Sequence, residues 1–247
     1  MTSAAWRLAV HASLPSTADL CRGCAEAGEP DGLAILALRQ TAGRGTRGRA
    51  WVGAPGNLFL SALLRPGGAA REASQWSLLA GVALAEALSP HVPDRQKLTL
   101  KWPNDLLLHG RKLAGILAES ATDARGGLSW LSLGFGVNLA SAPDVPERAT
   151  ACLAEYGPPP TPETLAWQVL EALARWRGIR AEAGFAPVRA AFLARAPALG
   201  TPLALRLGDG TRHGAFAGLG EDGSLLLRAD GRVHAFAAGE VTTGNGA

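Results

Sequence analysis

The order of apolar and polar residues along the chain predicts both strands and helices. Short apolar runs at 33–38 and 57–64 favour buried strands. Residues 73–88 form a longer run of small apolar residues that favours a helix. Further candidates are helices at 16–28 and 163–177 and strands that begin at Trp6 and Leu128. This mixture predicts an α+β fold, with a mixed β-sheet flanked by helices.

The second half of the chain contains two further patterns. Residues 97–120 are expected to form two strands joined by a turn at His-Gly-Arg. Beyond Gly200 the chain changes to short alternating strands separated by Asp-Gly pairs at 209, 222 and 230, which is typical of a small antiparallel barrel. We therefore predict a large domain over residues 1–198 and a small β domain over residues 199–247.

Composition is compatible with this division and argues against several function classes. The chain has 247 residues, 47% of them hydrophobic, enough for a large domain with an added module. The net charge is +3, but the basic residues are scattered, so no specific nucleic-acid binding is expected. No charge-free apolar run is long enough to span a membrane, and Arg7 and His11 interrupt the only candidate signal peptide.

The cysteines and lysines add two observations. The chain has three cysteines, which suits a reducing cytoplasm. Cys21 and Cys24 have the spacing of neighbours on a helix, and we favour that interpretation over a redox or zinc site, because only one further thiol exists. Lysine is rare beside arginine: Lys97, Lys101 and Lys112 are the only lysines, and they lie close together, where a compact ammonium group is wanted.

The segment AGRGTRGRAW at 42–51 has three arginines and a Gly-x-Gly-x-x-Gly spacing. A dinucleotide-binding turn would lead directly into a helix and be followed by an acidic residue near the next strand's end. Here WVGAPGN follows, and then a strand that ends in Arg65 without a carboxylate. A kinase is excluded too, because neither HRD nor DFG occurs downstream. The arginines therefore require another explanation.

Three other stretches combine polar residues with turns or apolar strands. KWPND at 101–105 places a cation, an aromatic ring, an amide and a carboxylate at one corner. RKLAGIL at 111–117 puts Lys112 before a buried run, where an unpaired charge is costly. GFGVNL at 134–139 ends a strand with Asn138, and its glycines allow a ligand close to the backbone. Each stretch by itself favours a structural role.

Taken together, AGRGTRGRAW, KWPND, RKLAGIL and GFGVNL, in this order, resemble the biotin protein ligases, and STA at 16–18 stands where that family usually has STN. The resemblance covers nearly the whole chain. It implies a catalytic domain like those of class II aminoacyl-tRNA synthetases and biotin synthetases, with an SH3-like C-terminal domain. It also implies a two-step reaction, in which biotin and ATP give biotinyl-5′-adenylate and pyrophosphate, and a lysine of a biotin carboxyl carrier protein takes the biotinyl group.

The resemblance also assigns roles. Those expected to bind biotin are Ser16, Thr17, Ala18, Gln40, Gly43, Arg44, Gly45, Thr46, Lys112 and Gly115. Those expected to bind ATP are Arg47, Arg49, Trp51, Asn104 and Asn138, and the catalytic candidates are Arg44, Lys112 and Asp105. The resemblance implies that Asp105 acts either through Mg²⁺ or by steering the incoming amine. Lys101 and Trp102 are expected to brace the corner.

Two departures and three alternatives remain. Ala18 replaces the usual asparagine, and Thr46 stands where many members have a second arginine. A lipoate ligase would share the fold and the adenylate chemistry, and a non-catalytic binding module would use only the barrel. A ligase that also represses transcription would need an N-terminal winged helix, for which the strand beginning at Trp6 leaves no room. Monomer and homodimer both stay open, as does the identity of the carrier.

Overall fold

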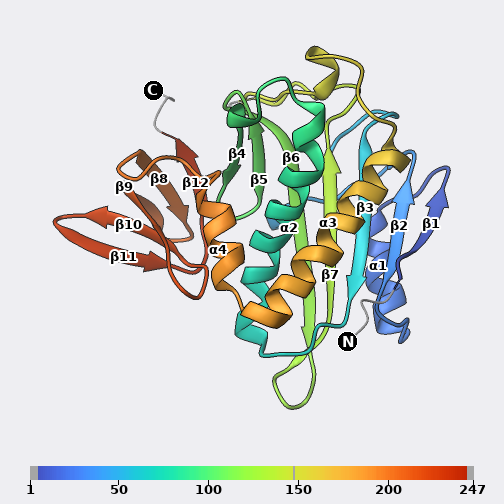
Figure 1. Cartoon of the computed structure of the whole chain (residues 1–247), viewed down its shortest axis with the longest axis horizontal. Coiled ribbons are helices and arrows are strands. Elements are labelled where there is room, and N and C mark those ends of the chain that lie inside the picture. The colour runs from blue at the N-terminus through green and yellow to red at the C-terminus, as the bar shows by residue number, and fades with distance from the viewer. Residues whose placement is uncertain (1–4, 147, 244–247) are drawn as a thin grey trace.

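The computed structural model describes residues 5–146 and 148–243, which form a seven-stranded mixed sheet and a five-stranded antiparallel sheet (Figure 1). The strands of the larger sheet, in spatial order, are β1 (Arg7–His11), β2 (Leu33–Ala37), β3 (Leu58–Leu64), β7 (Leu128–Val137), β6 (Arg111–Thr122), β5 (Asp105–Leu108) and β4 (Leu98–Lys101). Only β1 and β2 pair in parallel, and the other neighbours are antiparallel. The predicted α+β class with a mixed sheet is confirmed.

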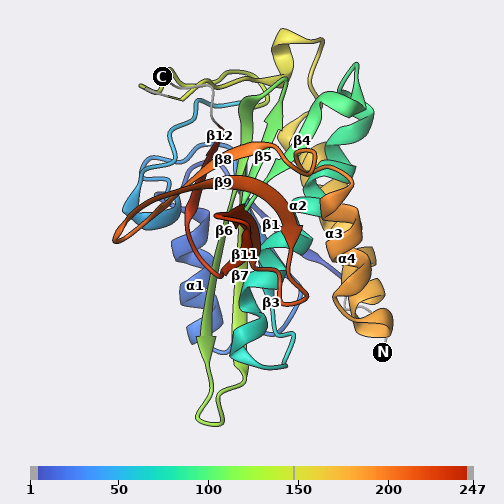
Figure 2. The same ribbon diagram turned by 90° about the vertical axis from the view of Figure 1, so that its left-hand side faces the viewer.

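Helices cover both faces of the larger sheet. Helix α1 (Thr17–Glu26) packs on one face against β2, β3 and β7. Helix α2 (Ala73–Leu88) and helix α3 (Pro162–Ala183) pack on the other face, with α4 (Ala186–Leu193) beside α2 (Figures 1 and 2). All seven residues of β3 are buried for this reason, which explains why its sequence is a continuous apolar run.

Several predicted boundaries match the structure closely. The helix at 73–88 is α2, and the helix at 16–28 is α1, with the Ser16 hydroxyl accepting a hydrogen bond from the Asp19 amide at 3.3 Å as its N-cap. Cys21 and Cys24 lie one turn apart on α1, and both are free thiols. Burial raises the pKa of Cys21 to about 11, so this thiol stays protonated at neutral pH.

Two predictions need correction. Residues 97–120 form three strands rather than two, because KWPND makes a second reversal between the short strands β4 and β5. A four-residue strand is too short to show a period, so the pattern of apolar residues does not reveal the reversal at KWPND. The helix expected at 163–177 extends to Ala183, and α4 follows it unpredicted, after Gly184 ends α3 with φ +70°.

The smaller sheet follows the Asp-Gly pattern. Its strands, in spatial order, are β11 (Arg232–Phe236), β10 (Leu225–Ala229), β9 (Gly210–Leu219), β8 (Pro202–Leu207) and β12 (Glu240–Thr243). The three Asp-Gly pairs lie in the connections between β8 and β11, and Figure 2 shows the sheet curling across the edge of the larger body. The division of the chain at residues 198 and 199 stays a prediction.

Hydrogen bonds from two side chains attach the smaller sheet to the larger body. The indole N–H of Trp102 donates to the Gly223 carbonyl at 3.1 Å, and the Arg189 guanidinium donates to the Leu219 carbonyl at 2.6 and 2.8 Å. Trp102 therefore fastens the KWPND corner to the β9–β10 connection, in agreement with its expected bracing role. In the part of the chain that the structure describes, no helix has the length and apolar character needed to cross a membrane.

Asn57 holds the chain where it leaves β7, and this contact yields a stability prediction. Its buried amide oxygen accepts from three consecutive backbone amides, those of Leu139, Ala140 and Ser141, at 2.9, 2.9 and 3.2 Å. Asn57→Ala leaves these donors without an acceptor and should lower the free energy of unfolding by about 2 to 4 kcal/mol in urea titration. Gln96→Ala, at an exposed amide, is the control and should change it by less than about 0.5 kcal/mol. A near-wild-type Asn57→Ala would contradict this account.

Candidate functional site

The segment AGRGTRGRAW at 42–51, which we call the glycine-arginine loop, folds back over the larger sheet. Gly45 donates to the Arg49 carbonyl at 2.7 Å, and Trp51 donates to the Gly43 carbonyl at 2.8 Å, so the two ends of the loop lie side by side. Thr46–Gly48 is a 3₁₀ turn in which Arg47 has φ 59°. A side chain on Gly43 would collide with the Trp51 carbonyl at 2.5 Å, which explains the glycine there. Thr46 and Arg47 therefore lie in a tight turn and not in an extended segment.

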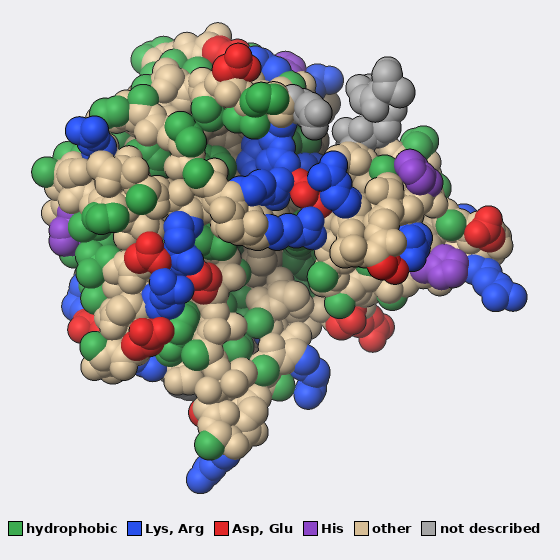
Figure 3. Space-filling model, turned by 180° about the vertical axis from the view of Figure 1, so that it is seen from behind, with side chains coloured by type: hydrophobic (Ala, Val, Ile, Leu, Met, Phe, Trp, Pro, Cys, Tyr) green, Lys and Arg blue, Asp and Glu red, His purple; other side chains and the backbone are tan. Residues whose placement is uncertain are grey.

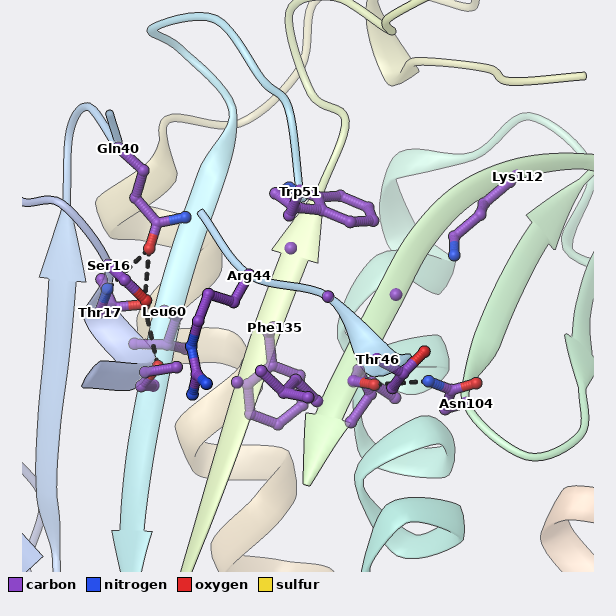
Figure 4. A pocket seen from close by; sticks show the side chains of 18 residues that line it. Ser16, Thr17, Gln40, Arg44, Thr46, Trp51, Leu60, Asn104, Lys112 and Phe135 are labelled. Carbon is purple, nitrogen blue, oxygen red and sulfur yellow. Dashed lines mark hydrogen bonds between the residues drawn. The ribbon is translucent and has the colours of Figure 1, made fainter. Parts of the chain in front are cut away.

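A cavity of about 50 Å³ lies beneath this loop and is enclosed by α1, β3, β6 and β7 (Figure 4). Eleven of the predicted site residues line it: Ser16, Thr17, Ala18, Gln40, Arg44, Gly45, Thr46, Trp51, Asn104, Lys112 and Gly115. We call this space the first cavity. The structure thus brings together residues that are up to a hundred positions apart in the chain.

One end of the first cavity carries a chain of polar groups. The Gln40 amide oxygen accepts from the Thr17 amide at 2.7 Å and from the Thr17 hydroxyl at 3.1 Å. The Ser61 hydroxyl, which is fully buried on β3, donates to the Thr17 hydroxyl at 2.9 Å. Together with Ser16 these groups offer donors and acceptors to a polar ligand in an otherwise apolar surrounding (Figure 4).

The Trp51 ring forms a wall of the first cavity against strands β6 and β7. A Cβ on Gly136 would lie 2.3 Å from the ring, so that position must be glycine for the ring to lie there, and a Cβ on Gly115 would lie 3.0 Å from the ring and would crowd it. The Lys112 ammonium lies 5.5 Å from the centre of the ring. The indole N–H is buried and has no partner among the described residues, so it is available to a ligand.

Asp105 forms a buried ion cluster with two lysines. Its carboxylate lies 2.5 Å from the Lys112 ammonium and 2.9 Å from the Lys101 ammonium, and the residue is 7% exposed. Burial by itself would raise the pKa of Asp105, but Lys112 and then Lys101 outweigh it and hold that pKa below its usual value. Burial lowers the pKa of Lys112, and Asp105 opposes that shift.

The donor set around Asp105 is a poor one for Mg²⁺. Among the described residues no three His, Cys, Asp or Glu side chains come close enough together to hold a metal ion. Two ammonium groups already occupy the oxygens of the Asp105 carboxylate. A resident cation at this carboxylate would meet their repulsion, so the local charges argue against Asp105 as a direct metal ligand.

Carboxylates from distant elements hold the loop arginines. Arg44 pairs with Asp19 of α1 at 3.0 Å and with Glu119 of β6 at 2.5 Å. Arg47 and Arg49 point the other way and pair with Glu240 of the smaller sheet at 3.2 and 2.7 Å. The loop therefore bridges the two sheets through its charges.

A second cavity of about 220 Å³ lies between the KWPND corner and the smaller sheet. Its lining includes Thr46, Arg47, Arg49, Lys101, Trp102, Pro103, Asn104, Asp105 and residues 237–241. Figure 3 shows Lys and Arg side chains gathered in the hollow between the two bodies. Thr46 and Asn104 line both cavities, so the two spaces adjoin.

Two predicted site residues line neither cavity. Gly43 lies at the base of the loop. Asn138 is 2% exposed, and its amide N–H donates to the Ala151 carbonyl at 3.1 Å, while its amide oxygen has no partner among the described residues. The side chain of Asn138 therefore holds the segment after β7, and its proposed contact with a ligand stays a prediction.

Sequence reasoning missed the carboxylates and some lining residues of the site. Glu119, Asp19 and Glu240 carry no local signal, because their partners are far away in the chain. Ser61 is hidden in an apolar run. Gly136 lies in the stretch GFGVNL. The two glycines of this stretch alternate on one face of β7, and this alternation was the sequence signal that could have located Gly136 in the site.

Comparisons with known proteins identify relatives across this whole region. Residues 11–138 match the "Biotin/lipoate A/B protein ligase family". A protein of Paracoccus denitrificans named biotin--[acetyl-CoA-carboxylase] ligase is 42% identical over 216 residues, covering 85% of this chain and 90% of the relative.

Two solved structures share the fold. The biotin protein ligase from Aquifex aeolicus in complex with biotin and ATP has a TM-score of 0.78 at 27% identity, covering 96% of this chain and 97% of that one. The biotin protein ligase from Leishmania major in complex with biotinyl-5-AMP has a TM-score of 0.65 at 25% identity, covering 94% and 99%.

The ion cluster around Asp105 yields a pH-dependent prediction. Asp105→Asn leaves two partly buried ammonium groups without a counter-charge and should lower the free energy of unfolding at pH 7 by about 3 kcal/mol. Because the folded-state pKa of Asp105 is depressed, its contribution is present above the unfolded pKa of about 3.9 and is lost as the pH falls further.

Urea titrations of wild type and Asp105→Asn at several pH values measure this effect. The gap between the two proteins should shrink below about pH 4. Asp144→Asn, at an exposed carboxylate, is the control and should show no such gap. A gap that stays constant down to pH 3 would contradict the assignment.

Proposed function

We propose that this chain, which belongs to the biotin/lipoate A/B protein ligase family and within it to the biotin protein ligases, is a biotin--[acetyl-CoA-carboxylase] ligase. The carboxylate of biotin attacks the α-phosphorus of ATP, which gives biotinyl-5′-adenylate and releases pyrophosphate. A lysine amine of a biotin carboxyl carrier domain then attacks the acyl carbon and releases AMP. The observation that carries the proposal is the first cavity, with its polar end at Thr17, its indole wall and its lysine.

Biotin fits the chemistry of the first cavity. Its ureido ring needs donors and acceptors together, which Thr17, Gln40 and Ser61 supply.

Lys112 is assigned to the reacting end of biotin. A compact ammonium group stabilises the negative charge that builds up on the oxygens around the α-phosphate. Asp105 orients that ammonium. The depressed pKa of Asp105 makes it a weak proton acceptor, so we assign it to positioning Lys112 and Lys101 and to steering the incoming amine. Mg²⁺ enters with ATP as part of the substrate.

In this proposal the two parts of the chain have different binding roles. Residues 1–198 bind biotin and ATP, through Arg47, Arg49, Trp51 and Asn104 for the nucleotide, and residues 199–247 help to engage ATP and the carrier. The Aquifex aeolicus relative binds biotin and ATP, and the Leishmania major relative binds biotinyl-5-AMP, which supports biotin and ATP as substrates and the adenylate as the intermediate. Three free thiols agree with a cytoplasmic enzyme.

Pyrophosphate exchange tests the proposal. Purified protein should incorporate labelled pyrophosphate into ATP only when biotin is present, and exchange driven by lipoate instead would favour the lipoate ligase. Lys112→Arg should slow the exchange by well over about tenfold, because a planar fork cannot replace a point donor in a closed site. Lys97→Arg, at an exposed lysine outside both cavities, is the control. Exchange that is equally fast without biotin would refute the assignment.

Thr46 should weaken the enzyme's hold on the adenylate. It lines both cavities, but its hydroxyl cannot supply the charge-assisted hydrogen bonds that an arginine offers, which are worth about 1.5 to 3 kcal/mol. Arg47 is adjacent, but its guanidinium is turned toward Glu240. Thr46→Arg should therefore release the preformed adenylate more slowly than wild type, by roughly tenfold. Dissociation after removal of free biotin measures this, and unchanged release would show that Thr46 is neutral.

A further inference from the structure

Three guanidinium groups converge on a single carboxylate at the rim of the second cavity. One oxygen of Glu240 accepts from Arg49 at 2.7 Å and from Arg148 at 2.6 Å, and the other accepts from Arg47 at 3.2 Å. Arg47 and Arg49 come from the glycine-arginine loop, and Arg148 comes from the segment after β7. Glu240 begins β12 in the smaller sheet, and its side chain is 15% exposed.

The charges at this point do not balance. Within the described residues, none of these three arginines forms an ion pair with any other acid. One carboxylate therefore faces three cations, while Lys101 on the same cavity wall is paired with Asp105. Each guanidinium has five N–H donors and uses only some of them here, so an anion with several oxygens can bind to the unused edges.

Glu240 itself lines the second cavity, together with Arg47 and Arg49. An anion that enters this space to reach Arg47 and Arg49 comes next to the Glu240 carboxylate and meets its charge. It must also share donors that both Glu240 oxygens already engage. The carboxylate therefore occupies the position that a phosphate oxygen would take, and opposes its arrival.

We propose that Glu240 competes with the polyphosphate group for the three arginines at the second cavity. It is a positioning residue, and it pairs with these arginines again when pyrophosphate leaves. This inference rests on the proposed function, in which ATP enters with its polyphosphate near Arg47 and Arg49 and pyrophosphate is the first product. The competition weakens the binding of ATP, but it weakens the binding of the leaving pyrophosphate as well. Glu240 thereby favours release over the reverse reaction.

The same contact reaches the reacting lysine. Arg148 directly precedes Ala149, whose carbonyl accepts from the Lys112 amide at 2.8 Å, and Ala151 donates to the Lys112 carbonyl at 2.9 Å. The segment that Glu240 holds through Arg148 thus pairs with the backbone of Lys112. Exchange of the arginines between Glu240 and a polyphosphate is therefore transmitted to the start of β6.

Calorimetric titration with inorganic tripolyphosphate, without biotin, tests the competition. Glu240→Gln keeps the size of the side chain and removes its charge, and should bind tripolyphosphate about tenfold more tightly than wild type, because charge-assisted hydrogen bonds become available. Glu240→Asp, whose shorter carboxylate cannot reach all three arginines, should bind with intermediate affinity. The control is Glu221→Gln, at an exposed glutamate in the connection between β9 and β10, and it should match wild type.

The outcomes separate this inference from the proposed function. Tripolyphosphate binding by Glu240→Gln that equals that of wild type, or no detectable binding by either protein, would overturn the competition. Weaker binding by Glu240→Gln would also overturn it, and would show that Glu240 helps to hold the arginines in place for the anion. In the exchange assay Glu240→Gln should lower the KM for ATP. Tighter tripolyphosphate binding together with no biotin-dependent exchange in wild type would leave the competition standing and remove the ligase assignment.

Discussion

The buried ion cluster of Asp105, Lys101 and Lys112 is the constraint on which the site depends. A buried ammonium is stable only with a close counter-charge, and here one carboxylate serves two ammonium groups. The cluster connects β4, β5 and β6, because Lys101 ends one strand, Asp105 begins the next and Lys112 lies near the start of the third. The reversal at KWPND is what brings the two lysines to the same carboxylate.

Close backbone packing and ion pairs both fix the loop over the cavities. Gly43 lets the two ends of the loop approach closely, and Gly115 and Gly136 of the larger sheet leave room for the Trp51 ring. The arginines of the loop are fixed by carboxylates that belong to other elements, Glu119 on one side and Glu240 on the other. The loop is thus held in place by ion pairs that a ligand can exchange, which suits the proposed closure of this segment over an adenylate.

The arrangement of the two cavities suits the proposed reaction. The first is small, with its polar groups at one end, and the second is larger and basic, and they adjoin at Thr46 and Asn104. Lys112 stands between them, lining the first and bonded to Asp105, which lines the second. An acid bound in the first cavity and a nucleotide extending into the second would meet at this lysine.

The sequence by itself determined the α+β class, the boundaries of α2, the Asp-Gly connections of the smaller sheet and most residues of the first cavity, because periodicity, turn chemistry and local motifs are written in neighbouring positions. Tertiary structure alone decided the pairing of Arg44 with Glu119, the convergence of three arginines on Glu240 and the place of Ser61. These contacts join residues that are far apart in the chain, and no local pattern encodes them. The short strands β4 and β5 became visible only through their pairing, since four residues are too few to show a period.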